Sequence, residues 1–189
     1  MSHEEDYSDA LVVEQILSGQ KDMFRLLLRR YERQVHGMGM SFFRNDDDAR
    51  DFSQEVFLKV YKNLSGFEGR ARFSTWLYKI AYNTALNAAS RRKEYSSLAE
   101  GPSEIEAGES QAPDRILLRK AAKEAVLESI RDLPERFRLC VDLFFFYERS
   151  YIEIEAITGI PVNTIKSHVF RAKKILREKL SEIADGGNL

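Results

Sequence analysis

The stretch Phe67–Arg92, FEGRARFSTWLYKIAYNTALNAASRR, decides how the N-terminal half of the chain folds. It opens with a glycine-containing loop, and Ser74 stands where a hydroxyl can cap the free N–H groups of a helix that runs to about Arg92. Apolar and small side chains recur along this helix at the spacing of one face. We expect that buried face to consist of Leu77, Ile80, Ala81, Thr84 and Ala88.

The opposite face of this helix is polar. It carries Lys79, Tyr82, Asn83, Leu86, Asn87 and Arg91. Asparagine is a middling helix former, so Asn83 and Asn87, which are one turn apart, need a reason other than helicity. Two interpretations are open: a plain solvated face, or a face that forms hydrogen bonds with base edges.

The loop before the helix favours the second interpretation. Phe67 and Phe73 flank Arg70 and Arg72, which places aromatic rings next to cations. Proteins bind single-stranded nucleic acid with this combination, because each base that stacks on an aromatic ring contributes about 1–3 kcal/mol. We therefore predict that the loop and the polar helix face bind bases that have left a duplex.

The composition describes a globular chain with segregated charge. Of its 189 residues, 43% are hydrophobic and 31% are charged, and the net charge is −1. Acidic residues concentrate near the N-terminus and basic residues near the C-terminus, so the average hides a basic end. The single cysteine, Cys140, excludes an internal disulfide and a cysteine metal site. Because the N-terminal sequence has neither a basic region nor an apolar core, we expect a cytoplasmic protein without direct membrane insertion.

The first 64 residues show helical periodicity in three segments, at about 9–17, 22–43 and 48–64. In the first, Leu11, Val12, Ile16 and Leu17 form the apolar stripe. In the second, Gly37 and Gly39 either weaken the helix or allow another helix to approach closely. In the third, we expect an inward face of Phe52, Val56, Val60 and Leu64 and an outward face that includes Asp51, Gln54 and Glu55.

The composition changes abruptly after residue 93. Residues 94–113 are rich in Ser, Gly, Glu and Ala, contain two prolines and have no helical period. An acidic segment of this kind is extended and mobile. We therefore expect an all-α fold in which two small helical domains, at 1–93 and 114–189, are joined by a flexible acidic linker at 94–113.

The second domain is predicted to begin with two helices. Asp114 starts a helix to about Arg131, and we expect its inward residues to be Leu117, Ala121, Ala125, Leu127 and Ile130. At Leu133-Pro134 this helix is expected to end and the next to begin, because proline is favoured in the first turn of a helix. The helix that follows is apolar on two sides, which predicts a core helix containing Phe137, Leu139, Cys140, Val141, Leu143, Phe144, Phe145 and Phe146.

The end of the chain contains a helix-turn-helix pattern. Residues 150–153 match a capping box, Gly159-Ile160-Pro161 makes a tight turn, and a last helix runs from 162 or 163 to about 180. Its inward residues are Ile165, Val169, Ala172, Leu176 and Leu180, and its outward residues are Asn163, Thr164, Ser167, Phe170, Arg171 and Lys174, with Lys166 and His168 beside them. A plain helical hairpin is the alternative. The capping and the positive charge favour a domain that reads bases with the first turns of this helix and binds phosphates with the last.

These segments resemble the bacterial extracytoplasmic-function sigma factors, small members of the sigma-70 family of RNA polymerase initiation factors. The resemblance covers nearly the whole chain and depends on three motifs in order. They are DARDFSQEVFLKVYKNL at 48–64, FSTWLYKIAYNTA at 73–85, and LPERF at 133–137 with GIPVNTIKSH at 159–168. In that family the first motif grips the clamp coiled coil of the polymerase β′ subunit, the second reads the −10 promoter element, and the third bounds the domain that reads the −35 element.

The resemblance implies site residues in three groups. Contacts with core polymerase are implied at Asp51, Gln54 and Glu55. Contacts with the melted −10 element, including a flipped base, are implied at Phe67, Arg70, Arg72, Phe73, Trp76, Lys79, Asn83 and Asn87. Contacts with the −35 major groove are implied at Asn163, Thr164, Lys166, Ser167, His168, Arg171 and Lys174.

The implied partners are core RNA polymerase, through its β′ clamp and β subunits, promoter DNA, and an anti-sigma factor. Asn163 departs from the family pattern, where glycine is common, and His168 stands where arginine is common. A neutral histidine lacks the bidentate fork of arginine, which puts one contact in question. At positions 52–53, Phe-Ser replaces the usual two aliphatic residues, which we interpret as a repacking.

Two other classes of protein are alternatives for this sequence. A stand-alone helix-turn-helix regulator explains residues 150–180 but leaves 48–64 and 67–92 without a role. An enzyme is not expected, because the sequence shows no P-loop and no nucleophile–base pair. Neither the lone His36 nor the acidic run Asp46–Asp48 has metal-site spacing, so we expect no metal and no cofactor.

Overall fold

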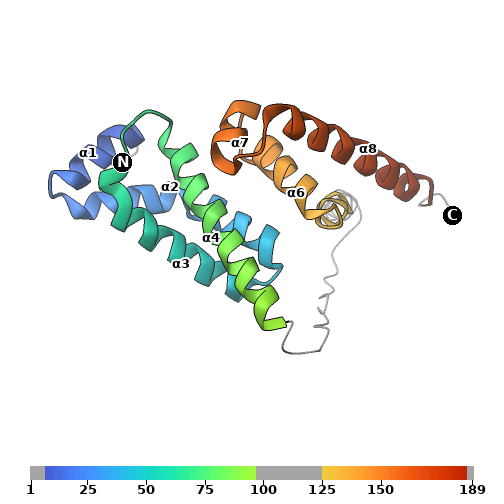
Figure 1. The fold of residues 1–189 in the computed structure, drawn as a ribbon, viewed down its shortest axis with the longest axis horizontal. Coiled ribbons are helices and arrows are strands. Elements are labelled where there is room, and N and C mark those ends of the chain that lie inside the picture. Colours follow the sequence, from blue (N-terminus) through green and yellow to red (C-terminus); the bar gives the residue numbers. More distant parts are fainter. Residues whose placement is uncertain (1–6, 97–124, 187–189) are drawn as a thin grey trace, which may run out of the picture.

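The computed structural model describes residues 7–96 and 125–186, which form helices and the turns between them (Figure 1). The N-terminal half contains α1 (Asp9–Leu17), α2 (Phe24–Phe43), α3 (Asp46–Asn63) and α4 (Phe73–Ser96), with short 3-10 turns at Lys21–Met23 and Leu64–Gly66. The C-terminal half contains a helical segment at 125–131, α6 (Glu135–Val141), a π-helical turn at Asp142–Phe146, α7 (Tyr151–Thr158) and α8 (Val162–Gly186). The predicted all-α fold is confirmed.

The close approach of α2 and α3 depends on a glycine. A Cβ atom placed on Gly39 would lie 2.8 Å from Cδ1 of Phe52 and 2.9 Å from Cα of Ala49. Carbon atoms do not approach this closely in packed interiors, so only glycine fits at this crossing. Of the two interpretations of Gly39, close helix contact is therefore the one that the structure supports.

Side chains and a glycine set the ends of several helices. The backbone N–H groups of Leu11, Asp48 and Glu153 donate to the side chains of Ser8, Asn45 and Ser150 at 3.3, 3.0 and 3.2 Å. Glu153 accepts in return from the Ser150 backbone, which completes the predicted capping box of α7. The same helix ends at Gly159, whose φ of 73° lies in the left-handed region that favours glycine. The predicted helix-turn-helix is confirmed.

The N-terminal core follows the predicted periodicity with two exceptions. The inward residues of α3, which are Phe52, Val56, Val60 and Leu64, are all buried. Tyr82, which was expected on the polar face of α4, is only 9% exposed, because its ring packs against Phe42 of α2. Leu17 was expected inside but is 51% exposed, and Val13 is buried in its place.

The predicted core helix of the C-terminal half is shorter than expected. After Val141 the chain winds into the wider π-helical turn Asp142–Phe146, which changes the direction of the side chains that follow. Phe145 and Phe146 are 47% and 53% exposed rather than buried, which corrects the expectation of a continuous core helix. Leu143, by contrast, is buried.

The two halves contact each other mainly where α7 lies beside the first turns of α4 (Figure 1). The α4 helix continues to residue 96, three residues into the predicted linker. The rest of that linker, and the predicted inward residues Leu117 and Ala121, lie outside the described residues. Within the two described ranges, no helix is both long and apolar enough to cross a membrane.

Candidate nucleic-acid interface

Three aromatic rings gather where the loop meets α4. The ring centroid of Phe67 lies 5.5 Å from that of Phe73 and 5.6 Å from that of Trp76, and the centroids of Phe73 and Trp76 are 5.8 Å apart. Phe67 and Trp76 are half-buried, whereas Phe73 is 3% exposed and packs against Tyr31 of α2. Phe73 is the first residue of α4 and points into the core, so it supports the other two rings and offers no face to a base. This corrects the sequence-based interpretation of Phe73 as a stacking ring.

The cations of this loop are well exposed. The side chains of Arg70 and Arg72 are 86% and 77% exposed. Arg70 pairs with Glu68 at 2.7 Å, and Arg72 lies 3.9 Å from a carboxylate oxygen of Glu153 in α7. Because exposed ion pairs are weak, both guanidinium groups can exchange these carboxylates for phosphates at little cost.

A polar stripe continues from this loop along α4. Lys79, Asn83, Leu86 and Asn87 are exposed in successive turns, as the sequence predicted. The opposite side of α4, which includes Leu77, Tyr78, Ala81, Thr84 and Ala85, is buried. Ser74 does not cap the helix as predicted. The helix begins one residue earlier, and the Ser74 hydroxyl accepts a hydrogen bond from Arg149 at 2.9 Å.

A separate polar face lies on α3. Asp51 and Gln54 are exposed, and the half-exposed Glu55 pairs with Lys59 at 2.7 Å. Lys59 also donates to the Thr84 hydroxyl of α4 at 3.1 Å, which ties this face to the helix that carries the polar stripe. Leu58, which was not among the residues predicted for this face, is 60% exposed one turn after Gln54. Its spacing of four residues from Gln54 was the available signal.

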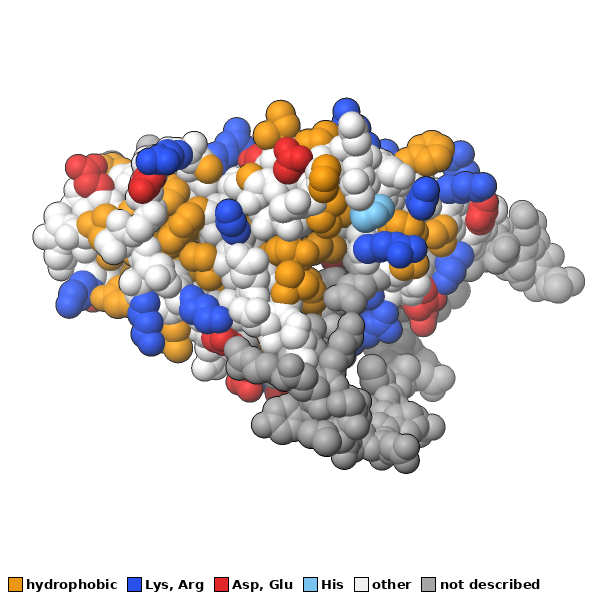
Figure 2. Space-filling model, in the orientation of Figure 1, with side chains coloured by type: hydrophobic (Ala, Val, Ile, Leu, Met, Phe, Trp, Pro, Cys, Tyr) orange, Lys and Arg blue, Asp and Glu red, His pale blue; other side chains and the backbone are white. Residues whose placement is uncertain are grey.

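The last helix, α8, presents most of the predicted contact residues to solvent. Asn163, Thr164, Lys166, Arg171 and Lys174 are exposed, and Ser167 is half-buried. Phe170, which is 70% exposed, extends the same face. Figure 2 shows Lys and Arg side chains over both halves of one face of the molecule, with a group of them toward the α8 end.

His168 is the exception on α8. Its ring lies 5.2 Å from the ring of Phe137, and its Nδ1 is 3.7 Å from Sγ of Cys140. Burial, together with the nearby charges of Arg136 and Arg171, holds the pKa of His168 below its ordinary value. This ring is therefore neutral at neutral pH and packs against α6.

An aromatic and lysine surface that the sequence analysis did not single out adjoins α8. The rings of Phe144 and Tyr151 stack with centroids 4.8 Å apart and planes 8° apart. The Lys173 amino group lies 5.1 Å from the ring centroid of Phe145, and that of Lys166 lies 5.9 Å from the centroid of Tyr151. Lysines at these distances are attracted to the ring faces. No sequence signal was available, because the π-helical turn places Phe144 and Phe145.

Comparison with known proteins identifies the family. The sigma-70 region 2 model matches residues 27–95, and the sigma-70 region 4 model matches residues 123–176. The RNA polymerase sigma-H factor of Pseudomonas aeruginosa is 33% identical over 183 residues, which cover 93% of this chain and 95% of that protein. The ECF RNA polymerase sigma-E factor of Escherichia coli is 34% identical over 187 residues, which cover 95% of this chain and 97% of that protein.

The chain belongs to the extracytoplasmic-function sigma factors of the sigma-70 family. Sigma factors are transcription initiation factors without catalytic activity, so this sigma factor is not an enzyme. Among the described residues, His, Cys, Asp and Glu side chains form no group of three that could hold a metal ion.

Solved structures show the same fold for this sigma factor. The sigma factor RpoE of Bartonella quintana, solved with the anti-sigma factor NepR, matches with a TM-score of 0.63 at 23% identity, over 84% of this chain and 96% of that chain. CnrH, solved with the cytosolic domain of CnrY, matches with a TM-score of 0.63 at 22% identity, over 94% of this chain and 97% of that chain.

Proposed function

We propose that this sigma factor binds core RNA polymerase and directs it to promoters by reading a −10 and a −35 element. The observation that carries the proposal is the presence of two exposed polar helix surfaces in different halves of one chain. One is the stripe on α4 with its aromatic and cationic loop, and the other is the exposed face of α8. A regulator that reads only one DNA element would need only the exposed face of α8.

The loop and α4 would hold the melted −10 strand. Phe67 and Trp76 have partly exposed rings on which an unstacked base can rest, and the cost of unstacking is offset by such contacts. The proposed contact residues are Phe67, Arg70, Arg72, Trp76, Lys79, Asn83 and Asn87, with Phe73 holding the two rings from inside.

The α8 helix would enter the −35 major groove. Its first turns expose Asn163, Thr164 and Lys166, which can form hydrogen bonds with base edges, and its later turns expose Arg171 and Lys174 toward phosphates. Ser167 lies between these groups. We propose that His168 positions α8 on α6, because its ring packs against Phe137.

The exposed face of α3 would bind core polymerase. Asp51, Gln54 and Glu55 provide polar contacts, and Leu58 adds an exposed apolar side chain at the next turn. Interfaces are strongest where an apolar anchor is surrounded by polar contacts. Promoter reading takes place on polymerase bound to DNA, so we place this sigma factor in the cytoplasm.

We further propose a regulatory partner and a domain division. The structural relatives RpoE and CnrH were solved with NepR and CnrY, which supports an anti-sigma factor for this chain. The family matches at 27–95 and 123–176 fit domains at 1–93 and 114–189 with a linker at 94–113. Two surfaces on one chain that each bind DNA weakly act cooperatively once polymerase fixes the distance between them.

The test is transcription in vitro from fragmented genomic DNA of the source organism, with core polymerase and the purified sigma factor. We expect transcripts that start downstream of a common pair of sequence elements, and none of these starts with core polymerase alone. Starts that are unchanged by the sigma factor would contradict the proposal. Unaided, sequence-specific binding to duplex DNA would then favour the stand-alone regulator.

A further inference from the structure

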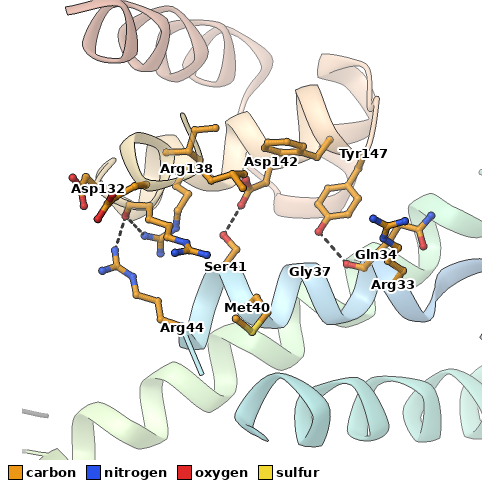
Figure 3. A pocket seen from close by; sticks show the side chains of 15 residues that line it. Arg33, Gln34, Gly37, Met40, Ser41, Arg44, Asp132, Arg138, Asp142 and Tyr147 are labelled. Atoms are coloured by element: carbon orange, nitrogen blue, oxygen red, sulfur yellow. Dashed lines mark hydrogen bonds between the residues drawn. The ribbon is translucent and has the colours of Figure 1, made fainter. Parts of the chain in front are cut away.

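A cavity of about 770 Å³ lies between α2 and the C-terminal half, and it is lined by none of the proposed polymerase or DNA contacts (Figure 3). Its volume falls within the range of about 300–1,000 Å³ that is typical of small-molecule sites. At one end, Arg44 of α2 donates to the backbone carbonyl of Arg131 at 2.5 Å. At the other end, the Tyr147 hydroxyl donates to the backbone carbonyl of Gln34 at 3.0 Å. Hydrogen bonds therefore hold the two walls together at both ends of the cavity.

Two guanidinium groups converge at the Arg44 end of the cavity. Arg44 and Arg138 both donate to the backbone carbonyl oxygen of Arg131, at 2.5 and 3.0 Å. Arg131 is itself exposed and lines the same cavity. Because like charges repel at short range, three arginines gathered in this way attract an anion.

The carboxylates around the cavity do not neutralise these arginines. Asp132 pairs with Lys179 at 2.8 Å, and Asp142 accepts a hydrogen bond from Ser41. The third carboxylate is that of Glu128, which is exposed. Among the side chains that the structure describes, no carboxylate forms an ion pair with the two exposed arginines at this end. The walls of the cavity therefore keep an excess of positive charge.

An aromatic ring without a ring partner lines the same cavity. Phe146 lies in the π-helical turn and is 53% exposed, and it makes no ring contact with another described aromatic side chain. The preceding Phe145, by contrast, packs edge-on against Phe144 with ring centroids 4.9 Å apart, and it does not line the cavity. Phe146 thus offers a ring face on which a flat aromatic molecule can stack.

The end of the cavity near Tyr147 carries a hydrogen-bond acceptor without a donor. Gln34 lines the cavity there, and its side-chain oxygen is buried and accepts no hydrogen bond from a described residue. A buried acceptor without a donor is costly, and the terminal torsion of a glutamine side chain is soft. A ligand with an amino group can supply the donor at this end.

We propose that this cavity binds a nucleotide, whose phosphates contact Arg44, Arg131 and Arg138 and whose base stacks on Phe146 with its polar edge toward Gln34. The fork of N–H groups on a guanidinium matches phosphate oxygens, and several arginines suit the multiple charge of a phosphate chain better than a single carboxylate. A nucleotide joins such a chain to a flat base. The proposal concerns a site apart from the polymerase and DNA contacts and does not depend on them.

The site is tested by calorimetric titration of the purified full-length protein, without polymerase or DNA. The probes are the four common nucleoside triphosphates, the matching nucleosides and tripolyphosphate. We expect at least one triphosphate to bind at one site per chain, and its nucleoside and tripolyphosphate to bind about tenfold more weakly, because each makes only part of the contacts. Equal affinity for tripolyphosphate would overturn the assignment to a nucleotide. Absence of binding by all four triphosphates at millimolar concentration would overturn the site.

Two variants remove the proposed contacts. Arg131→Gln removes a guanidinium group, and Phe146→Ala removes the ring. The matched controls are Arg177→Gln, at an exposed arginine of α8, and Phe145→Ala, at the exposed ring next to Phe146. Circular dichroism checks that each variant is folded. We expect the Kd to rise about tenfold in the two cavity variants and to change less than about twofold in the controls. Equal affinities in the cavity variants and their controls would contradict the proposal.

Two further variants separate the cavity from the proposed DNA surfaces, which also attract phosphates. Arg72→Gln removes an exposed guanidinium from the loop before α4, and Arg171→Gln removes one from α8. We expect both to bind the nucleotide as the parent protein does. A loss of affinity in either variant as large as that in Arg131→Gln would place the nucleotide on a DNA surface and overturn the cavity site.

Discussion

The hydroxyl of Ser41 in α2 donates a hydrogen bond to the buried carboxylate of Asp142 at the start of the π-helical turn. Burial raises the pKa of Asp142 to about 6, although the Ser41 bond and the charge of Arg138 act in the opposite direction. The other charged groups that line the adjoining cavity are Arg33, Arg44, Glu128, Arg131 and Asp132. The two halves are therefore joined through a carboxyl group that gains or loses its proton near neutral pH.

This arrangement predicts a pH-dependent stability that Asp142→Asn removes. Because the folded pKa is raised above that of the unfolded chain, the stabilising contribution is complete below the unfolded pKa and is lost as the pH rises through about 6. The difference amounts to about 2–3 kcal/mol across this window. Urea unfolding of the parent and of Asp142→Asn at several pH values measures it. Parallel pH profiles for the two proteins would contradict the assignment.

Replacing Gly39 should destabilise the crossing of α2 and α3. The Gly39→Ala side chain would meet Phe52 and the backbone of Ala49 at 2.8 and 2.9 Å, so one helix must move. Overpacking of this kind costs about 1–3 kcal/mol in the free energy of unfolding. Gly66→Ala is the matched control, because a Cβ atom there meets no atom within 4 Å. Equal urea midpoints for the two variants would argue against the close crossing.

Phe67 and Phe73 should respond differently to alanine substitution. Phe73→Ala removes a buried ring and should lower the free energy of unfolding by about 3–4 kcal/mol. Phe67→Ala removes a half-buried ring and should mainly weaken binding of single-stranded −10 DNA in the polymerase complex. Unfolding and DNA-binding measurements on both variants provide the comparison. A larger stability loss in Phe67→Ala than in Phe73→Ala would contradict the assigned roles.

Asn87→Ala should lower promoter-specific initiation while leaving the affinity for core polymerase intact. Asn87 is exposed on the polar stripe of α4, whereas the proposed polymerase face lies on α3. Loss of one side-chain contact with a base should reduce initiation by about tenfold. Abortive initiation assays and a polymerase titration on the same preparation check this. Loss of both activities together would count against separate surfaces.

Local sequence signals predicted the helices and much of the candidate site. The Ser150–Glu153 capping box, the turn at Gly159 and the inward face of α3 each depend on residues within a few positions of one another, and all are present. The polar stripe of α4 was predicted in the same way, apart from Tyr82. Periodicity assigned Tyr82 outward, but the nearby Phe42 ring gives it a buried place.

The features that sequence patterns could not predict depend on distant contacts. Phe73 was assigned to a base-binding loop, yet its position against Tyr31 follows from how α2 packs on α4. The π-helical turn breaks the 3.6-residue period, so Phe145 and Phe146 were misplaced. The contact between α4 and the C-terminal half joins polar residues such as Ser74 and Arg149, which have no periodic signal and are 75 positions apart.

The most direct test of the central claim is a titration of the purified protein into core RNA polymerase from the same organism at near-physiological salt, followed by fluorescence anisotropy. We predict tight one-to-one binding that weakens on Gln54→Ala and on Leu58→Ala but not on Gln20→Ala, an exposed glutamine between α1 and α2. Absence of binding, or equal binding by all three variants, would contradict the account of α3 as the polymerase contact and of the chain as an initiation factor that acts through it.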